Sequence, residues 1–377
     1  MSPVSGVDVA GGDVSYTEAL VARPPHGVTY TTYVDALSDG TLVERGRRPK
    51  HGPLGTADAA VLAARGVELG LRRSRLMFRE PYRYLTVDPD AFDLVHAHLF
   101  SVRLVGSRIP LVTSSGRPLP VLYEDFFHWS HAHVVAATWA ERLLARTVGA
   151  EVSWFPPRHA ACTMVQSEHY RHLLVEAGAD PGRVVARALG TDGTAGRPRT
   201  GPPRTVGFVS TTFEEKGGQV VLAAFSKVVA EHPDARLLIV GSAPRPVPTL
   251  PGGAVEWLGR VPRDELLAVH FPRIDVLALP TMGDSGTPYV IQEALQRGVP
   301  VVTSDLSWLD EGLTGPGVRR VPVDPDQVAD ALLELLDVDT YAGASAAAVE
   351  LWASRYSMDV VAEQVGETYR AVLGSPP

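Results

Sequence analysis

Cysteine is almost absent from this sequence: Cys162 is the only one among 377 residues. A single cysteine excludes an intramolecular disulfide and a zinc site made of several cysteines. Because Cys162 lies in the apolar run 160–165, we expect a small buried side chain rather than a nucleophile. No metal site is expected.

Long apolar runs are also missing, and so is an excess of positive charge. No segment approaches the roughly 20 apolar residues that span a bilayer, and no basic stretch followed by an apolar one marks a signal peptide. The formal net charge is −8, whereas general nucleic-acid binders are usually basic. The cytosol is the expected location, and nucleic acid is not an expected partner.

The sequence does contain an alternation of short apolar runs with helical patterns, which is typical of α/β proteins with parallel sheets. The chain is long enough for two domains, and a stretch rich in Gly, Pro, Thr and Arg at 191–203 suits a linker. Strands are expected at 27–33, 93–99, 110–114, 161–167, 206–210, 235–240, 255–258, 276–279 and 299–303. Helices are expected at 132–148, 168–177, 218–231, 263–270, 289–297, 325–336, 340–356 and 359–373.

The most informative segment runs from Pro280 to Val302. It reads as a strand, a glycine-containing loop, a helix and a Gly-Val-Pro turn. A loop that enters a helix presents unpaired N–H groups and the positive end of the helix dipole, which suits phosphate. Glu293 follows within the helix, where its carboxylate can accept hydrogen bonds from ribose hydroxyls. The alternative is an ordinary helix with a solvated glutamate.

This segment resembles the signature of glycosyltransferase family 4, whose members are retaining, nucleotide-sugar-dependent enzymes. Residues 293–295 and 298–302 match the second half of that signature. The resemblance implies that Glu293 binds the donor ribose and that the loop before it faces the diphosphate. The first glutamate of the signature falls on Ser285, and Asp284 is its substitute one position earlier.

Two further segments support the resemblance. Lys216 and Gly217 match the Lys-Gly of the family's first donor-domain strand and loop, while the family's arginine falls on Thr211. The resemblance implies that Lys216 neutralises the diphosphate, although a solvated lysine is the alternative. Residues 255–262 look like the strand and loop that hold the nucleobase through backbone groups near Gly259.

The N-terminal half matches the family more loosely. Residues 93–99 resemble a strand that ends in His-x-His, but two histidines alone make no zinc site. Ser115 and Gly116 stand at the place of the family's histidine near the reaction centre, and Asp125 and His128 are the substitutes. An aromatic packing cluster is the alternative for His128.

The candidate residues fall into two overlapping groups. The candidate catalytic residues are Lys216, Glu293, Asp284, His128 and Asp125. The candidate donor-binding residues are Gly12, Thr211, Lys216, Gly217, Gly259, Val261, Ser285, Gly286, Thr287, Pro288, Tyr289, Val290 and Glu293.

The region 45–83 is locally basic. Solvated helix faces explain most such runs. The functional alternative is docking of an anionic acceptor, or peripheral contact with an acidic membrane surface at the inner face of the membrane.

The resemblance, strongest over 205–305, implies the GT-B fold: two Rossmann-like, doubly wound α/β domains that face each other across a cleft. We expect an acceptor-binding domain at 1–195 and a donor-binding domain at 196–355. A C-terminal helix within 356–377 is expected to pack back on the N-terminal domain.

The expected activity is transfer of a hexosyl group from a nucleoside diphosphate sugar to an acceptor hydroxyl, with retention of configuration. The donor is expected to be a UDP- or GDP-sugar, without metal or cofactor, and the acceptor a glycan, lipid-linked or small molecule. One alternative is a catalytically silent relative that binds a nucleotide or glycan, or that partners an active transferase. Another is a different GT-B enzyme, such as an epimerase or a phosphorylase. A nicotinamide dehydrogenase is not expected, because no Gly-x-Gly-x-x-Gly follows a strand.

Overall fold

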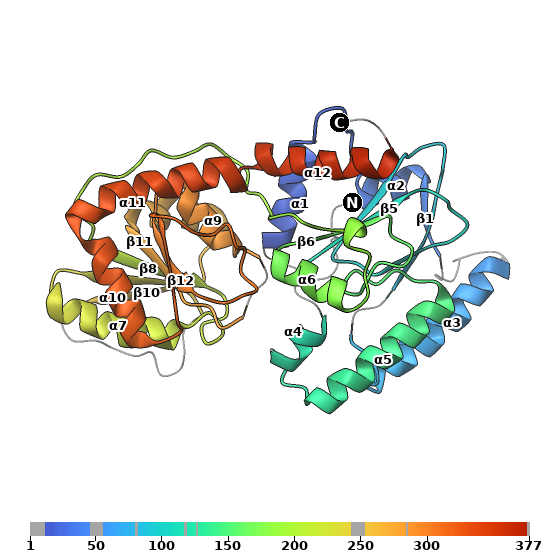
Figure 1. The fold of residues 1–377 in the computed structure, drawn as a ribbon, viewed down its shortest axis with the longest axis horizontal. Helices are drawn as coiled ribbons and strands as arrows, with labels where there is room; N and C mark the ends of the chain where they lie inside the picture. Colours follow the sequence, from blue (N-terminus) through green and yellow to red (C-terminus); the bar gives the residue numbers. More distant parts are fainter. Residues whose placement is uncertain are drawn as a thin grey trace. The chain divides into compact units, whose positions relative to one another are not determined.

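The computed structural model describes residues 12–45, 56–79, 82–116, 119–125, 127–242, 253–283 and 286–374. Contacts divide the chain into two compact units. Unit 1 comprises residues 1–187 and 362–377, and unit 2 comprises residues 188–361. Unit 1 therefore ends before the boundary expected at residue 195, and it includes most of the C-terminal helix. Figure 1 shows the elements of both units.

Unit 2 contains one six-stranded parallel sheet in the order β10-β9-β8-β11-β12-β13. Helices α7 and α10 pack together on one face of it, while α9 and α11 lie on the other (Figure 1). The strands are β8 (Thr205–Ser210), β9 (Arg236–Gly241), β10 (Val255–Gly259), β11 (Val276–Leu279), β12 (Val301–Ser304) and β13 (Val318–Val321). The helices are α7 (Gly218–Glu231), α8 (Arg263–Glu265), α9 (Tyr289–Gln296), α10 (Pro325–Leu336) and α11 (Val338–Leu351), with short turns at η3 (Leu266–His270), η4 (Phe271–Arg273) and η5 (Trp352–Tyr356).

The sequence explains where these helices begin. The Asp324 carboxylate accepts hydrogen bonds from the N–H groups of Asp326 and Gln327, and Pro325 occupies the first turn of α10. Both features are typical of helix N-termini. By contrast, α7 begins after Gly217, which has a φ of 78°. That left-handed conformation favours glycine, so the chain turns sharply between β8 and α7.

Unit 1 contains a four-stranded parallel sheet, β3-β5-β6-β7, and a three-stranded sheet, β1-β2-β4. Its strands are β1 (Leu42–Glu44), β2 (Arg83–Val87), β3 (Val95–His98), β4 (Val102–Leu104), β5 (Leu111–Ser115), β6 (Cys162–Val165) and β7 (Val184–Ala186). Its helices are α1 (Gly12–Ala22), α2 (Tyr33–Asp39), α3 (Thr56–Arg73), α4 (Leu119–Asp125), α5 (His131–Val148), α6 (Glu168–Glu176) and the turn η1 (Pro181–Arg183). Helix α12 (Met358–Leu373) supplies its last part to this unit.

Helices α3 and α5 are joined by a buried ion-pair network. The Arg72 guanidinium on α3 contacts Glu68 at 2.9 Å and Glu141, on α5, at 3.1 Å. Burial raises the pKa of Glu141, and the charge of Arg72 opposes that rise. Since unpaired buried charges are costly, this network fixes how the two helices pack.

The strand expected at 27–33 is wrong. Val28 donates a backbone hydrogen bond to Pro25 in a turn, and the Thr32 hydroxyl accepts one from the N–H of Asp35 at 3.2 Å. Thr32 therefore caps helix α2, so Tyr33 begins a helix instead of ending a strand. The expected strands at 93–99, 110–114 and 161–167 are present as β3, β5 and β6.

Candidate functional site

The sheet of unit 2 reverses its strand order next to β8. From β8 the chain moves outward to β9 and β10, and then returns to β11 on the other side of β8. In doubly wound sheets, ligands bind outside the carboxyl ends of the strands at such a switch point. The two loops that leave this point are residues 211–217, after β8, and residues 280–288, after β11. They carry most of the donor-binding candidates.

These two loops touch each other. The N–H of Met282 donates to the carbonyl of Glu215 at 2.9 Å, and the Lys216 ammonium donates to the carbonyl of Gly283 at 3.3 Å. A Cβ atom at Gly217 would lie 2.2 Å from the carbonyl oxygen of Pro280. Any side chain at position 217 would therefore push the loops apart. The structure holds Lys216 against the loop that leads into α9.

The entry to α9 is anchored by a buried polar network. The Thr287 hydroxyl donates to the Tyr356 hydroxyl at 3.1 Å, which donates to Asp310 at 2.6 Å. Arg355 donates to the same carboxylate at 2.8 Å, and Asp310 donates its backbone N–H to the carbonyl of Gly286. Burial raises the pKa of Tyr356 well above its usual value. The network therefore fixes the backbone of residues 286 and 287.

The first residues of α9 are the remaining candidates from this segment. Pro288 is the residue before the helix, and its carbonyl accepts the N–H of Ile291 at 2.9 Å. Tyr289 and Val290, the first two helical residues, are half-buried. The first N–H groups of a helix have no partner within the helix, so they suit an anion.

Glu293 is a buried carboxylate, with 4% of its surface exposed. It forms an ion pair with Arg263, whose guanidinium lies 5.4 Å from the centre of the Tyr289 ring. Burial raises the pKa of Glu293, while the charges of Arg263 and Arg297 oppose that rise. The carboxylate is thus held beside two cations.

Sequence reasoning missed Arg263 as a site residue. Its segment follows the expected nucleobase loop, but an arginine there gives no sign that it reaches a glutamate on α9. The network of Asp310, Arg355 and Tyr356 was missed for the same reason, because its members are far from the loop in the sequence. In the sequence, Asp310 and Arg355 are simply charged residues beside apolar ones, and nothing else indicates that they meet.

The other donor candidates of unit 2 lie at the ends of their strands. Gly259 ends β10 with a φ of 69°, and Val261 follows it, half-buried. Thr211 is exposed after β8, and its carbonyl accepts the Ser242 hydroxyl at 2.5 Å. Asp284 and Ser285 lie outside the described residues.

The candidates of unit 1 lie in different elements. Gly12 is the first residue of α1, and Asp125 is the last residue of α4. His128 is exposed between α4 and α5 and has a φ of 52°. It lines a pocket together with Arg75 and Arg79, which follow the end of α3.

The two histidines of β3 belong to a buried hydrogen-bond chain. The Ser114 hydroxyl lies 2.7 Å from both His96 Nε2 and His98 Nδ1. His96 Nδ1 lies 2.6 Å from the hydroxyl of Tyr369, on α12, which contacts the Tyr30 hydroxyl at 3.1 Å. A hydroxyl has one proton, so Ser114 can donate to only one of the two imidazoles, and their tautomers are coupled.

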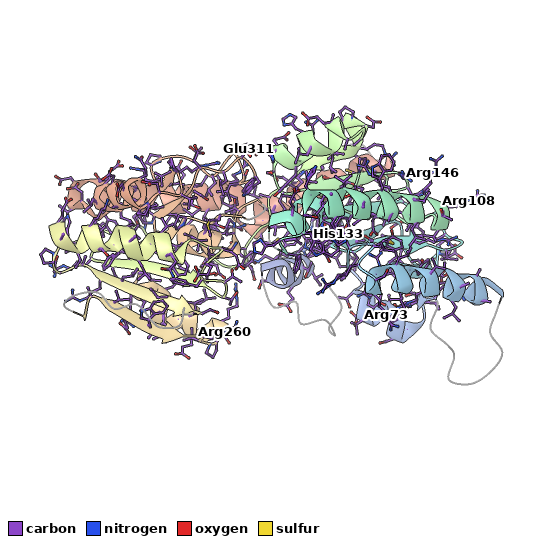
Figure 2. All side chains as sticks on the ribbon, turned by 90° about the horizontal axis from the view of Figure 1, so that it is seen from below. Arg73, Arg108, His133, Arg146, Arg260 and Glu311 are labelled. Atoms are coloured by element: carbon purple, nitrogen blue, oxygen red, sulfur yellow. The ribbon has the colours of Figure 1, made fainter. Side chains whose placement is uncertain are left out.

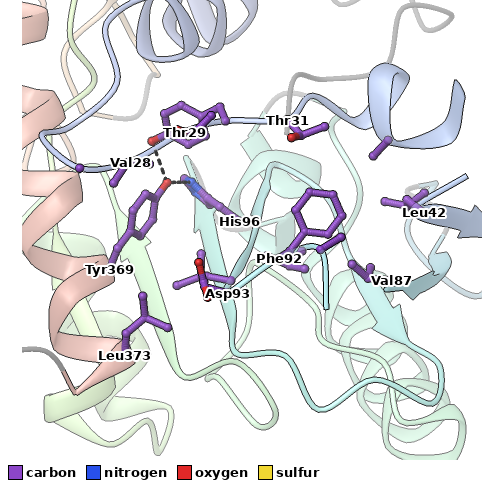
Figure 3. A pocket seen from close by; sticks show the side chains of 16 residues that line it. Val28, Thr29, Thr31, Leu42, Val87, Phe92, Asp93, His96, Tyr369 and Leu373 are labelled. Atoms are coloured by element: carbon purple, nitrogen blue, oxygen red, sulfur yellow. Dashed lines mark hydrogen bonds between the residues drawn. The ribbon is translucent and has the colours of Figure 1, made fainter. Parts of the chain in front are cut away.

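This chain borders a pocket of about 380 Å³ lined by residues 27–31, residues 91–96 and α12. In Figure 3, His96 and Tyr369 point toward each other at its wall. Burial holds the pKa of His96 well below its ordinary value. His96 is therefore neutral and acts within unit 1 as a hydrogen-bonding group.

The described residues offer neither a metal site nor a membrane span. In the part of the chain that the structure describes, no three His, Cys, Asp or Glu side chains gather as a metal site would need. Among the same residues, no helix combines the length and the apolar character needed to cross a membrane.

Residues 203–338 match the family model described as glycosyl transferases group 1. The chain is 35% identical over 187 residues to a phosphatidyl-myo-inositol mannosyltransferase of Mycolicibacterium smegmatis, a match that covers 48% of each protein. It is 31% identical over 191 residues to a D-inositol 3-phosphate glycosyltransferase of Corynebacterium urealyticum, which covers 46% of this chain and 44% of that protein. The chain spans about half the length of these curated relatives.

Solved structures match more of the chain. An Anabaena protein, Alr3699/HepE, in complex with UDP and glucose, has a TM-score of 0.53 at 15% identity and covers 85% of this chain and 84% of its own. A glycosyltransferase of Rickettsia africae has a TM-score of 0.52 at 12% identity, and the match covers 87% of this chain and 85% of that protein. These likenesses, with the family match, confirm the GT-B fold class and the resemblance to glycosyltransferase family 4.

Proposed function

We propose that this chain is a glycosyltransferase that moves a hexosyl group from a nucleoside diphosphate sugar to an acceptor hydroxyl, with retention of configuration. One observation carries the proposal: the loop of Lys216 and the loop entering α9 touch at the switch point of the unit 2 sheet. The family match over residues 203–338 covers both loops and supports it.

In this proposal the donor lies along the carboxyl edge of the unit 2 sheet. Lys216 and the N-terminal amides of α9 neutralise the diphosphate. Glu293 accepts hydrogen bonds from the ribose hydroxyls, and backbone groups near Gly259 and Val261 hold the nucleobase. Residues 284 and 285 are proposed to contact the transferred sugar. Arg263, beside Glu293, supplies positive charge to the site.

The reaction breaks the bond between the sugar anomeric carbon and the phosphate oxygen and forms one from that carbon to the acceptor oxygen. The acceptor hydroxyl proton passes to the departing phosphate oxygen on the same face of the sugar. Preorganised cations and amides stabilise the charge that develops on the diphosphate, which is where such sites lower the barrier. No cofactor enters this scheme, and His128 and Asp125 are not required as bases.

The relatives suggest which substrates to test first. Several are named phosphatidyl-myo-inositol mannosyltransferase, and another is named as GDP-mannose-dependent. We therefore propose GDP-mannose as the first donor to test and a phosphorylated polyol, free or lipid-linked, as the first acceptor. Peripheral membrane contact through the basic region 45–83 is part of this proposal.

A thermal-shift screen against UDP, GDP, ADP, TDP and their sugars tests the donor site, because a ligand of the native state raises the melting temperature by mass action. Turnover with the nucleotide sugar that binds, followed as release of the nucleoside diphosphate, tests the activity. We expect Lys216→Ala and Glu293→Ala to abolish transfer while the protein stays folded. Turnover near wild type in both variants would refute the assigned roles.

A second candidate function is nucleotide binding without transfer. It is favoured by Thr211, which stands where the family has an arginine. A clear thermal shift with a nucleotide, combined with no turnover of any donor, would establish this second function instead of the first.

A further inference from the structure

Arg263 begins α8, in the turn that follows β10. This turn contains two arginines, and their surroundings differ. Arg260, labelled in Figure 2, is exposed directly after β10. The Arg263 guanidinium instead forms an ion pair with Glu293, the buried carboxylate on α9. One of the two arginines is therefore held against the donor site that the proposed function describes.

The ion pair occupies the carboxylate that the proposed function assigns to the ribose. Because only 4% of Glu293 is exposed, a ligand reaches its carboxylate by displacing a neighbouring group. The Arg263 side chain is 47% exposed, so it can turn away without disturbing packed neighbours. In the free protein, Arg263 thus covers a group that the donor needs.

The other cation near Glu293 is fixed in place. The Arg297 guanidinium donates to the backbone carbonyl of Glu293 and to the side-chain carbonyl of Gln296, both at 2.9 Å. It also lies 5.5 Å from the centre of the Phe271 ring. Its charge opposes the rise in the pKa of Glu293 that burial causes. Arg297 can therefore keep a positive charge beside the carboxylate while Arg263 moves away.

A path leads Arg263 from Glu293 to the start of α9. Its guanidinium lies 5.4 Å from the centre of the Tyr289 ring, and Tyr289 is the first residue of that helix. Tyr289 and Glu293 are four residues apart, so their side chains share one helix face. Aromatic rings attract guanidinium groups, and the first N–H groups of a helix suit an anion. The ring therefore supports Arg263 beside both the carboxylate and the anion site.

We propose that Arg263 exchanges partners when the donor binds: it releases Glu293 to the ribose hydroxyls and pairs with the diphosphate at the start of α9. The inference rests on the proposed function, because it concerns the same site. A planar guanidinium matches two phosphate oxygens at once, which makes the diphosphate a good second partner. A nucleoside without phosphate breaks the ion pair and offers nothing in return. Arg263 thus makes the site select ligands that carry both a ribose and a diphosphate.

The test compares ligands that differ only in the diphosphate. The probes are guanosine, uridine, adenosine and thymidine, each beside its own diphosphate, and isothermal titration calorimetry of the full-length protein gives the Kd of each. The variant is Arg263→Ala, and the matched control is Arg273→Ala. Arg273 is also an arginine of unit 2 that forms an ion pair with a glutamate, Glu256, and its side chain is 44% exposed. Both variants therefore lose the same charge and a similar contact.

We expect Arg263→Ala to change the two affinities in opposite directions. Without the ion pair Glu293 is free, so the Kd of the nucleoside should fall by about twofold to fivefold. Without the guanidinium the diphosphate loses a charge-assisted contact, so the Kd of the nucleoside diphosphate should rise by about tenfold. The control should leave both values unchanged. Changes in the same direction, or a nucleoside Kd that does not fall, would overturn the proposal.

A double variant shows whether the carboxylate is responsible. In a Glu293→Gln background there is no ion pair to release, so Arg263→Ala should no longer lower the Kd of the nucleoside. It should still raise the Kd of the nucleoside diphosphate, because that contact does not need the carboxylate. A gain in nucleoside affinity that persists in this background would contradict the exchange of partners.

Melting curves of the same proteins show that each variant is folded. If Arg263→Ala is not, Arg263→Met takes its place with the same expected changes, because methionine keeps an unbranched apolar stem beside Tyr289 without the charge. The result also separates this inference from the proposed function. A wild type that binds the probes, with variants that lack the opposite changes, would refute the exchange and leave the donor site intact. A wild type that binds none of the probes would refute the donor site, and the exchange with it.

Discussion

Replacing Arg263 with alanine tests how the buried carboxylate of Glu293 is stabilised. Arg263 forms an ion pair with Glu293, and Arg297 lies near the same group. Removing one partner of a fully buried pair costs about 3–5 kcal/mol. The Arg263 side chain is 47% exposed, and Arg297 remains, so the cost must be reduced for solvent screening. We expect Arg263→Ala to destabilise unit 2 by about 1–2 kcal/mol.

The loss should depend on pH in a defined direction. Burial raises the pKa of Glu293 above its ordinary value of 4.5, so the folded state holds this proton more readily than the unfolded state does. Above the folded pKa the ionised carboxylate costs stability, and protonation removes that cost as the pH falls through it. Without Arg263 the pKa rises further. The deficit of the variant should therefore shrink as the pH falls from neutrality toward the ordinary glutamate value of 4.5.

Differential scanning calorimetry of the full-length protein measures both effects. For a unit of this size, each kcal/mol corresponds to roughly 2–4 °C in melting temperature. Arg263→Ala is also combined with Glu293→Gln, which leaves no carboxylate at that position. Arg260→Ala serves as a control for loss of an exposed arginine three residues before Arg263. The reasoning is wrong if Arg263→Ala costs the same stability with and without Glu293→Gln, or if its deficit is constant across this pH range.

The remaining predictions concern other parts of the two units. Lys216→Ala should leave the melting temperature within roughly 2 °C of wild type but remove donor turnover, and retained turnover in a kinetic assay would contradict its role at the diphosphate. Asp310→Ala removes a buried carboxylate that pairs with Arg355, so calorimetry should show a loss of about 2–4 kcal/mol, and a loss below about 1 kcal/mol would mean that the network is not cooperative. His96 is buried and its pKa is depressed, so below roughly pH 6.5 the unfolded state binds more protons than the folded state. The free energy of unfolding of unit 1 should therefore fall by up to about 1.4 kcal/mol for each pH unit as the pH decreases. In melting curves measured over a pH series, His96→Asn should reduce this dependence of stability on pH. An unchanged dependence would assign the loss of stability to other groups.

The sequence predicted unit 2 better than unit 1, for a physical reason. The predicted strand 276–279 and the predicted helices 218–231 and 325–336 have the same bounds in the structure. Each is a strong apolar pattern that ends at a turn or a capping residue. The strands β1, β2, β4 and β7 of unit 1, and β13 of unit 2, were not predicted. Three of them have only three residues, and β2 begins at Arg83, the last residue of the basic region. Their pairing in space decides their structure, and short sequences do not show it.

The sequence could nominate candidate site residues only where they lie in a segment with a local pattern. Lys216 stands in the loop before α7, and Glu293 lies within α9 after a glycine-containing loop, so each is part of a strand, loop and helix pattern. Their partners could not be nominated in this way, since Arg263 and Tyr356 reach the site from elements that are distant in the sequence. A local pattern contains the backbone positions of a phosphate site, but not the side chains that neutralise or anchor it.

The position of α12 has a consequence for how the protein is made. Unit 2 is one continuous stretch of chain, whereas unit 1 needs residues 362–377, including Tyr369, whose hydroxyl contacts His96. During synthesis, unit 2 can therefore complete its contacts while the wall beside His96 is still missing its helix. Residues 1–187 can complete the contacts of unit 1 only after α12 has been synthesised. A gene fragment ending at residue 187 should consequently give a poorly folded product, while one encoding 188–361 should be the better candidate for separate expression.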